Sequence, residues 1–325
     1  MAEITASGKK RLVLVTGRAH PQLAVDIAAE LETELVHTDA RTFANGEIYA
    51  RYDESVRGCD AFVIQSHTYP INEWLMEQLI MVDALKRASA KRITVVAPFY
   101  PYARQDKKGR GREPVSARLV ADLFKAAGAD RIMSVDLHAA QIQGFFDGPV
   151  DHLFAMPVLL KYFTERLDPS ALTVVSPDMG RVRVADIWSD KLGAPLAIIH
   201  KRRDPLVPNK VTVHEIVGEV RGRTCLIVDD MIDTGGTIVK AAEALKLAGA
   251  TNVVVAATHA VFSPPASEIL QSDFIDSVVV TDTLPIPPEK RFPTLTVLPI
   301  APLIASAIRE VFSDGSVTSM FDGAA

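Results

Sequence analysis

Short apolar runs rich in β-branched residues alternate with amphipathic helical patterns along almost the whole chain. The helical patterns include residues 23–32, 74–88 and 116–128, where apolar side chains recur every three to four positions. Strands that are apolar on both faces and alternate with helices are typical of a mostly parallel sheet flanked by helices. The sequence therefore predicts an α/β fold. The strand candidates are residues 11–17, 61–66, 92–99, 131–137, 172–177, 194–200, 211–216, 224–230, 252–259, 277–282 and 295–300.

Two stretches of the chain are similar to each other. Residues 82–99 and 242–259 align without a gap at an offset of 160. Each stretch combines the end of a predicted helix with the strand that follows it. The similarity indicates one α/β unit used twice, and chance likeness between two such units is the alternative. Only the second unit carries Asp-Thr-Gly-Gly-Thr between its preceding strand and its helix.

The length of 325 residues predicts two domains, because a domain usually has roughly 100–200 residues. Proline and glycine within residues 147–157 end one pattern before the next begins. We place the boundary there, with domains of residues 1–152 and 153–325. Whether the C-terminal helix packs back on the first domain is left open by the pattern.

The composition argues against several classes of protein. The net charge is −5 and the pI about 5.9, whereas general nucleic-acid binders are more often basic. Cys59 and Cys225 follow no zinc spacing and form no disulfide framework, so a reducing cytoplasm fits best. Residues 1–11 lack the apolar segment of a secretory signal. Residues 294–308 are interrupted by prolines and polar residues, which favours a buried strand and helix over a membrane span.

One strand-to-helix connection carries an unusual set of residues, Val-Asp-Asp-Met-Ile-Asp-Thr-Gly-Gly-Thr at 228–237. The apolar strand at 224–230 precedes it, and a helical pattern at 238–248 follows it, with Gly249 as a stop. In open α/β sheets, ligands bind beyond the carboxyl ends of the strands. We therefore expect a ligand at this loop.

The second half of the loop suits an anion. Gly235 and Gly236 carry no side chains, so backbone N–H groups can approach a phosphate. The start of a helix adds unpaired N–H donors and a partial positive charge. Thr234 and Thr237 add hydroxyl donors. The alternative is an ordinary helix N-terminus, capped by Asp233 or Thr234, with the glycines forming a turn.

The first half of the loop suits a sugar. Asp229 and Asp230 would repel a phosphate, but their carboxylates accept hydrogen bonds from sugar hydroxyls or bind Mg²⁺ held by those hydroxyls. A sugar phosphate satisfies both halves of the loop.

The loop resembles the phosphoribosyl-diphosphate (PRPP) motif shared by type I phosphoribosyltransferases and PRPP synthetases. It is not a mononucleotide P-loop, because Gly-x4-Gly-Lys-[Ser/Thr] is absent from the sequence. Further segments resemble the ribose-phosphate pyrophosphokinase family, in order and over almost the whole chain. The resemblance implies two similar phosphoribosyltransferase-like domains, a first that binds nucleotide and a second that binds ribose 5-phosphate. These segments are residues 43–66, 97–108, 134–153, 174–180 and 200–205.

A basic segment at residues 102–114 has two interpretations. It is either an exposed basic loop or a clamp for a triphosphate, because guanidinium groups bind phosphate oxygens in bidentate fashion. The family resemblance implies the second interpretation. It assigns Arg104, Gln105 and Asp106 to ATP binding.

The resemblance also implies an adenine site at residues 43–47. Phe43 would lie against the adenine and Glu47 near its amino group, with Asn45 and Gly46 between them. Related sequences usually have Asp-Gly-Glu here, so Asn45 keeps a carbonyl but loses a charge. A simple Asn-Gly turn is the alternative.

The expected cofactor is Mg²⁺, and the resemblance assigns His138 and Asp178 as its ligands. His138 follows the strand candidate at 131–137, although a lone histidine is more often structural. Imidazole is not a favoured ligand of Mg²⁺, so a mixed or partly water-mediated shell is expected. Where the family often has small residues after Asp178, this chain has Met179, Gly180 and Arg181.

Residues 200–205 form either a solvated basic turn or a catalytic loop. The resemblance makes Lys201 the catalytic lysine and Arg203 its partner on the substrate. Asp204 stands where related sequences often have proline. For ribose 5-phosphate, the resemblance implies Arg203, Asp229, Asp230, Asp233, Thr234, Gly235, Gly236 and Thr237.

The activity implied by the resemblance is transfer of a diphosphoryl group from ATP to the 1-hydroxyl of D-ribose 5-phosphate. The products are AMP and PRPP, a precursor for nucleotide and amino-acid biosynthesis. A non-catalytic regulatory homologue and a phosphoribosyltransferase are the alternatives, and no general base is identified. The family also implies a cytoplasmic homo-hexamer with ADP and inorganic phosphate as effectors, and neither a nucleic-acid nor a membrane partner.

Overall fold

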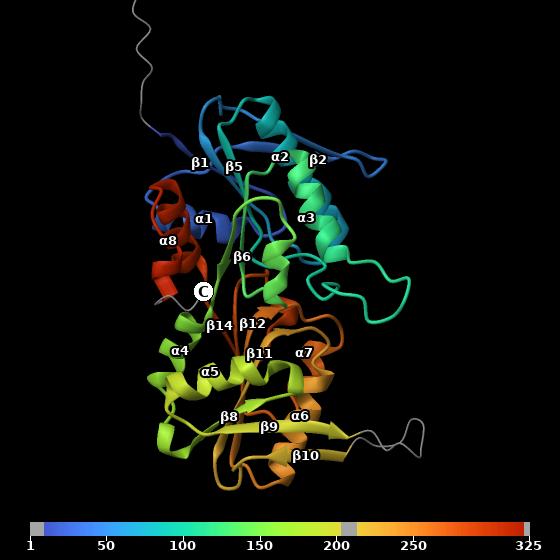
Figure 1. The fold of residues 1–325 in the computed structure, drawn as a ribbon, viewed down its shortest axis with the longest axis vertical. Coiled ribbons are helices and arrows are strands. Elements are labelled where there is room, and N and C mark those ends of the chain that lie inside the picture. Colours follow the sequence, from blue (N-terminus) through green and yellow to red (C-terminus); the bar gives the residue numbers. More distant parts are fainter. Residues whose placement is uncertain (1–9, 203–212, 322–325) are drawn as a thin grey trace, which may run out of the picture. The chain divides into compact units, whose positions relative to one another are not determined.

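The computed structural model describes residues 10–202 and 213–321. The chain divides into two compact units (Figure 1). Unit 1 comprises Met1–Phe154 together with Ala301–Ala325, and unit 2 comprises Ala155–Ile300. The expected boundary between residues 152 and 153 falls close to the break between Phe154 and Ala155.

Unit 1 is built on a five-stranded sheet in the order β1-β4-β5-β6-β7. Every neighbouring pair of strands in this sheet is parallel. The central strands are buried almost throughout, which explains their continuous apolar runs. The strands are β1 (Leu12–Thr16), β4 (Asp60–Ile64), β5 (Arg92–Val96), β6 (Arg131–Val135) and β7 (Val150–Leu153).

The helices of unit 1 cover the sheet in pairs. α2 packs with α3, and their apolar side chains share one core with alternate residues of the strands. α8 lies beside α1 (Figure 1), and the Arg309 side chain donates a hydrogen bond to the backbone carbonyl of Glu30 at 2.9 Å. The last helix of the chain therefore belongs to unit 1. The helices are α1 (Pro21–Glu30), α2 (Ile71–Arg87), α3 (Ser116–Ala127) and α8 (Ala301–Phe312), with short 3-10 turns η1 (Ala140–Gly144) and η5 (Thr318–Phe321).

A separate two-stranded antiparallel hairpin, β2 (Thr38–Thr42) with β3 (Ile48–Tyr52), extends unit 1. β3 packs against α2, where the hydroxyl of Tyr52 donates to the carbonyl of Met81 at 2.8 Å. These strands were not predicted, because β2 is mostly polar and no residue of either strand is fully buried. The loop of this hairpin carries residues 43–47.

Unit 2 is built on a seven-stranded sheet in the order β10-β9-β8-β11-β12-β13-β14. β10 runs antiparallel to β9, and the remaining neighbours are parallel. The strands are β8 (Leu172–Ser176), β9 (Leu196–Arg202), β10 (Val213–Val217), β11 (Thr224–Ile232), β12 (Asn252–Ala260), β13 (Ser277–Thr281) and β14 (Leu295–Leu298). The helical segments are α4 (Met156–Thr164), α5 (Val182–Leu192), α6 (Gly236–Leu247) and α7 (Ala266–Ile269), with η2 (Pro169–Ala171), η3 (Met179–Arg181) and η4 (Pro288–Lys290).

The order of strands in unit 2 reverses at β8. From β8 the chain passes through α5 to β9 on one side, whereas β11 lies on the other side of β8 and continues through α6 to β12. Open α/β sheets bind their ligands at the carboxyl ends of strands where such a reversal occurs. The loops after β8 and β11 are therefore the expected place for a site in unit 2.

The predicted α/β fold is confirmed, and each strand candidate coincides with an observed strand. The two similar stretches also correspond: α2 ends at Arg87 and α6 at Leu247, while β5 begins at Arg92 and β12 at Asn252, the same offset of 160. Residues 294–308 form β14 and the first part of α8, as predicted. Within the described residues, no helix has both the length and the apolar character needed to cross a bilayer.

Candidate active site

The two acids of the motif lie at the carboxyl end of β11. Hydrogen bonds of the sheet extend past them to Ile232, and Asp229 pairs in register with Ala257 of β12. The backbone N–H of Asp230 donates to Oδ1 of Asp229 at 2.8 Å. Both side chains are largely buried, with 16% and 8% of their surface exposed. β11 thus fixes the two carboxylates beside each other.

The ionisation of Asp229 is shifted by this environment. Burial, and then the negative charge of Asp230, raise the pKa of the Asp229 carboxyl well above its ordinary value. The Arg181 guanidinium acts in the opposite direction, because a nearby positive charge favours the carboxylate. Arg181 therefore offsets only part of the rise in the Asp229 pKa.

Arg181 supplies this positive charge from the neighbouring loop. Its Nε lies 3.2 Å from Oδ1 of Asp229, and its Nη2 lies 2.5 Å from Oδ1 of Asp230. β8 and β11 are parallel neighbours, so the loops that follow them meet at the same edge of the sheet. The sequence marked Arg181 only as a departure from the family pattern. A basic residue after one strand and acids after another were the available signal, but their meeting depends on strand order.

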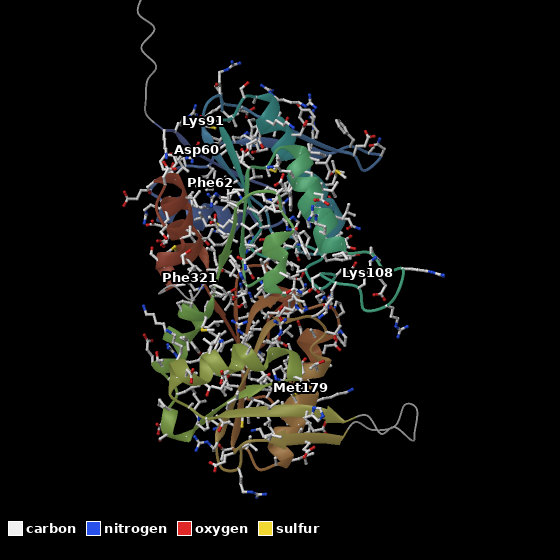
Figure 2. All side chains as sticks on the ribbon, viewed as in Figure 1. Asp60, Phe62, Lys91, Lys108, Met179 and Phe321 are labelled. Atoms are coloured by element: carbon white, nitrogen blue, oxygen red, sulfur yellow. The ribbon has the colours of Figure 1, made fainter. Side chains whose placement is uncertain are left out.

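Asp178 shapes the turn that carries Arg181. It is half-buried after β8, and its Oδ1 accepts a hydrogen bond from the backbone N–H of Gly180 at 2.8 Å. The hydroxyl of Ser176 donates to the Asp178 carbonyl at 2.7 Å. Met179 is exposed on the same turn and is labelled in Figure 2. Asp178 is therefore held at the edge of the sheet on which Asp229 and Asp230 lie.

The glycines of the motif form the start of α6. Gly235 is the N-cap residue with a left-handed backbone (φ 78°), and α6 begins at Gly236. As a glycine, this N-cap residue has no side chain with which to cap the helix. The alternative placed Asp233 or Thr234 at the N-cap position, whereas the structure has Gly235 there. The first turn of a helix has backbone N–H groups without partners inside the helix, and these can bind an anion.

Around this helix start, Thr234 and Thr237 are exposed and Asp233 is half-buried. Burial lowers the pKa of Lys290 of η4 below its ordinary value, although the negative charges of Glu289 and then of Asp233 act to raise it. Lys290 also donates to the carbonyl of Val261 at 3.1 Å. Sequence reasoning did not identify this lysine, which comes from a different part of unit 2.

The predicted catalytic loop begins at the end of β9. The backbone of Lys201 pairs with His214 of β10, and β9 runs parallel to β8. Lys201 therefore belongs to the same edge of the sheet as Asp178, the edge at which the parallel strands β8 and β9 end. Arg203 and Asp204 lie outside the described residues.

In unit 1, residues 43–47 form the tight loop of the β2–β3 hairpin. The N–H of Phe43 donates to the carbonyl of Glu47 at 2.7 Å, and Asn45 Oδ1 accepts from the N–H of Glu47 at 3.2 Å. Gly46 has a φ of 91°, so the predicted Asn-Gly turn is confirmed. The Phe43 ring is 47% exposed and contacts Tyr49 edge to face, with ring centroids 6.1 Å apart. An exposed aromatic ring on a rigid turn can stack with a planar base.

The basic segment joins β5 to α3 and is largely exposed. Figure 2 labels Lys108 on this loop, which extends away from the sheet of unit 1. Arg104 and Gln105 are exposed, and Gln105 Oε1 accepts from the hydroxyl of Ser116 at 2.5 Å. The basic residues of the loop are Arg104, Lys107, Lys108, Arg110 and Arg112.

Asp106 differs from its neighbours because it is buried. Its Oδ2 accepts a hydrogen bond from Nε2 of Gln141, which belongs to η1. The carboxylate therefore ties the basic loop to the segment that follows β6. This contact gives Asp106 a structural function whatever its relation to a nucleotide.

His138 lies in that same segment, half-buried beyond the carboxyl end of β6. The N–H of the preceding Leu137 donates to Nε2 of His152 on β7, at 2.9 Å. His138 belongs to unit 1 and Asp178 to unit 2, so their shared role stays a prediction.

The residues at these sheet edges are compatible with Mg²⁺. In the described part of the chain, no group of three or more His, Cys, Asp and Glu side chains could by itself hold a metal ion. Mg²⁺ seldom needs such a cage, since it is usually bound by one or two carboxylates together with substrate phosphates and water. The Asp178 carboxylate suits a shell of that kind.

A family model described as the N-terminal domain of ribose phosphate pyrophosphokinase matches residues 12–128, and one described as the phosphoribosyl synthetase-associated domain matches residues 204–322. A ribose-phosphate pyrophosphokinase of Streptomyces avermitilis is 64% identical over 322 residues, which cover 99% of each chain. The chain belongs to the ribose-phosphate pyrophosphokinase family. Another relative of that name, from Mycobacterium leprae, is 62% identical over 98% of this chain and 97% of its own.

A crystal structure of phosphoribosylpyrophosphate synthetase from Mycobacterium smegmatis has the same fold. It matches with a TM-score of 0.90 and 60% identity, covering 94% of this chain and 100% of its own. Family membership confirms the resemblance seen in the sequence motifs. The two matched domain models include the hairpin loop, the basic loop and the start of α6.

Proposed function

We propose that this chain is a ribose-phosphate diphosphokinase, which converts ATP and D-ribose 5-phosphate into AMP and PRPP. Membership of the ribose-phosphate pyrophosphokinase family supports the proposal. The observation that carries it is the connection after β11. There, paired carboxylates and a helix start with glycine at its N-cap position follow each other within ten residues.

Ribose 5-phosphate has two kinds of group to be recognised. The backbone N–H groups at the start of α6, with the hydroxyls of Thr234 and Thr237, donate to the 5-phosphate oxygens, and Asp233 closes the loop. Asp229 and Asp230 accept hydrogen bonds from the ring hydroxyls. The anion and the ring are thus bound by opposite ends of one loop.

ATP binds through residues of unit 1 in this proposal. The exposed Phe43 ring stacks on the adenine, and Glu47 lies near its amino group on the turn made by Asn45 and Gly46. Arg104 and Gln105 contact the phosphates, while Asp106 holds the loop through Gln141.

The reaction transfers one group between two bound anions. The 1-hydroxyl oxygen of the sugar forms a bond to the β-phosphorus of ATP, and the bond from that phosphorus to the α-phosphate oxygen breaks. The hydroxyl proton is lost and AMP leaves. Catalysis of such a transfer rests on positioning and neutralisation of charge. Lys201 and Arg203 stabilise the charge on the transferring phosphates.

Mg²⁺ belongs to the same proposal, with Asp178 and His138 as its protein ligands. When bound, it screens the negative charge of the triphosphate. The chain's own residues orient the sugar: Asp178 sets the turn after β8, and Asp229 and Asp230 direct the ring hydroxyls.

The decisive test is release of AMP from ATP by the purified protein. We expect release only when ribose 5-phosphate and Mg²⁺ are both present, and we expect Lys201→Ala to lower kcat by about 10²-fold or more. Release of AMP without ribose 5-phosphate would contradict the proposal. A phosphoribosyltransferase would instead consume PRPP with a nucleobase and need no ATP, whereas a regulatory homologue would bind nucleotide without turnover.

The oligomeric state and the cellular compartment are predicted from the family resemblance. We expect a cytoplasmic homo-hexamer that responds to ADP and inorganic phosphate. Cys59 and Cys225 support a reducing compartment, because both are buried free thiols. Analytical ultracentrifugation with and without ADP and phosphate measures the assembly directly.

A further inference from the structure

Arg181 has a contact pattern that the fold alone does not require. Neighbouring residues of a strand normally point to opposite faces of the sheet, yet Asp229 and Asp230 both place Oδ1 against this one guanidinium. The arginine reaches them from the turn after β8, in front of the carboxyl end of β11. Its side chain is 15% exposed, so Arg181 and the two acids lie together largely away from water.

The chemistry of the contact favours a positioning function. Two adjacent buried carboxylates repel each other, and a single cation between them offsets that repulsion. Arginine has a planar fork with fixed directions, so it fixes orientation as well as charge, which lysine does not do. Here Nε serves one carboxylate and Nη2 serves the other. β11 sets the spacing of the two acids, and the fork therefore determines which way their carboxylates face.

The structure of the sugar determines which of its hydroxyls are left to bind these carboxylates. In the proposed reaction the 1-hydroxyl attacks phosphorus and carbon 5 carries the phosphate that α6 binds. The hydroxyls on carbons 2 and 3 are then the ones left for Asp229 and Asp230. A rigid pair of acids is suited to a pair of adjacent hydroxyls.

We propose that Arg181 is a positioning residue that fixes Asp229 and Asp230 for the 2- and 3-hydroxyls of ribose 5-phosphate and thereby sets the preference for ribose over 2-deoxyribose. The inference rests on the proposed function of this loop. It assigns a specific role to the residue at which this chain departs from the small residues common in its family.

The test measures binding of two sugars by calorimetry, ribose 5-phosphate and 2-deoxyribose 5-phosphate. The variants are Arg181→Ala, Arg181→Lys and Arg181→Gln. The matched control is Arg183→Ala, which removes the same charge from an exposed position of α5. Thermal unfolding of each variant shows whether it is folded at the temperature of the titration.

We expect Arg181→Ala to weaken binding of ribose 5-phosphate by about 10- to 100-fold, because hydrogen bonds to charged groups are lost. Binding of the 2-deoxy sugar falls less, so the ratio of the two affinities shrinks. Arg181→Lys and Arg181→Gln recover part of the ratio, through the charge and the hydrogen bonds respectively. Arg183→Ala keeps both affinities within about twofold of the native protein.

If every Arg181 variant binds both sugars more weakly by the same factor, Arg181 has only a structural role. If both affinities are unchanged, Arg181 has no role in binding the sugar. If Arg181→Ala does not fold, the ratio in Arg181→Lys and Arg181→Gln decides. Failure of the underlying function looks different: the native protein would then not bind ribose 5-phosphate, or Asp229→Asn would bind it as well as the native protein does.

Discussion

Leu270 lies directly against Gly235. A β-carbon on Gly235 would stand 3.3 Å from Cγ of Leu270, and the backbone there has a φ of 78°. At the adjacent Gly236 the backbone is helical, and a β-carbon would meet no atom of the described residues within 4 Å. The first glycine is thus required by the fold of unit 2, whereas the second faces open space at the start of α6.

Alanine substitutions at Gly235 and at Gly236 test folding and ligand binding separately. Gly235→Ala is expected to destabilise the protein by about 1–2 kcal/mol, because the left-handed backbone disfavours a β-carbon. Gly236→Ala should unfold at or slightly above the native temperature, since alanine favours helix, yet bind ribose 5-phosphate at least about tenfold more weakly. Thermal melts and calorimetry check both. Native affinity in Gly236→Ala would show that the 5-phosphate lies elsewhere.

The exposed ring of Phe43 provides a test of the nucleotide site. Phe43→Ala should raise the KM for ATP by about 5- to 100-fold, because stacking of a base on an aromatic ring contributes roughly 1–3 kcal/mol. Its melting temperature should stay native, since 47% of the residue is already exposed. Val25→Ala is the control, because Val25 is 48% exposed on α1 of the same unit. An unchanged KM for ATP would remove Phe43 from the adenine site.

Much of the fold could be predicted because buried parallel strands leave a clear sequence signal. Strands such as β4 and β12 are apolar almost throughout and therefore stand out. β7 was missed because only Leu153 of its four residues is fully buried, and an aspartate and a histidine interrupt it. The apolar pattern of this short edge strand is therefore too weak to be recognised.

The candidate site, too, could be predicted from the sequence only in part. Asp229, Gly235 and Gly236 could be predicted together because one continuous loop brings them together. The contact of Arg181 with the acids could not, since it depends on β8 lying beside β11, and strand order is not encoded in local periodicity. Lys290 was missed for the same reason.

A buried ion pair in unit 1 has a measurable effect on stability. The Glu77 side chain is fully buried, and its carboxylate accepts hydrogen bonds from Arg18 Nε at 2.5 Å and from Gln65 Nε2 at 2.8 Å. Arg18→Ala should lower the free energy of unfolding by about 3 kcal/mol, because a buried charge loses its partner. Urea unfolding measures this loss.

The control is Arg118→Ala, which breaks an exposed pair with Asp122 and should cost about 0.5 kcal/mol or less. Combining Arg18→Ala with Glu77→Gln should recover part of the lost stability, because the unpaired charge is removed. If the double variant is as unstable as the sum of the single ones, the two residues are not coupled.

The raised pKa of Asp229 makes a prediction about pH. Burial and the charge of Asp230 favour the protonated form in the folded protein, whereas the unfolded chain ionises near its ordinary value of 3.8. Between that value and the raised pKa the folded state holds the extra proton, so raising the pH lowers the stability of the native protein. A side chain that cannot ionise at position 229 abolishes this pH-dependent loss of stability.

Asp229→Asn is therefore expected to be more stable than the native protein, by a margin that grows as the pH rises and then levels off above the folded pKa of Asp229. The margin should nearly vanish below about pH 3.8, where the carboxyl is protonated in the folded and in the unfolded chain alike. Urea unfolding of both proteins between about pH 3.5 and pH 8 measures it. The same variant should bind ribose 5-phosphate poorly, because the amide replaces one acceptor oxygen with a donor. A margin independent of pH would mean that the titration of Asp229 does not control stability, and a native-like affinity would mean that its carboxylate does not hold the sugar.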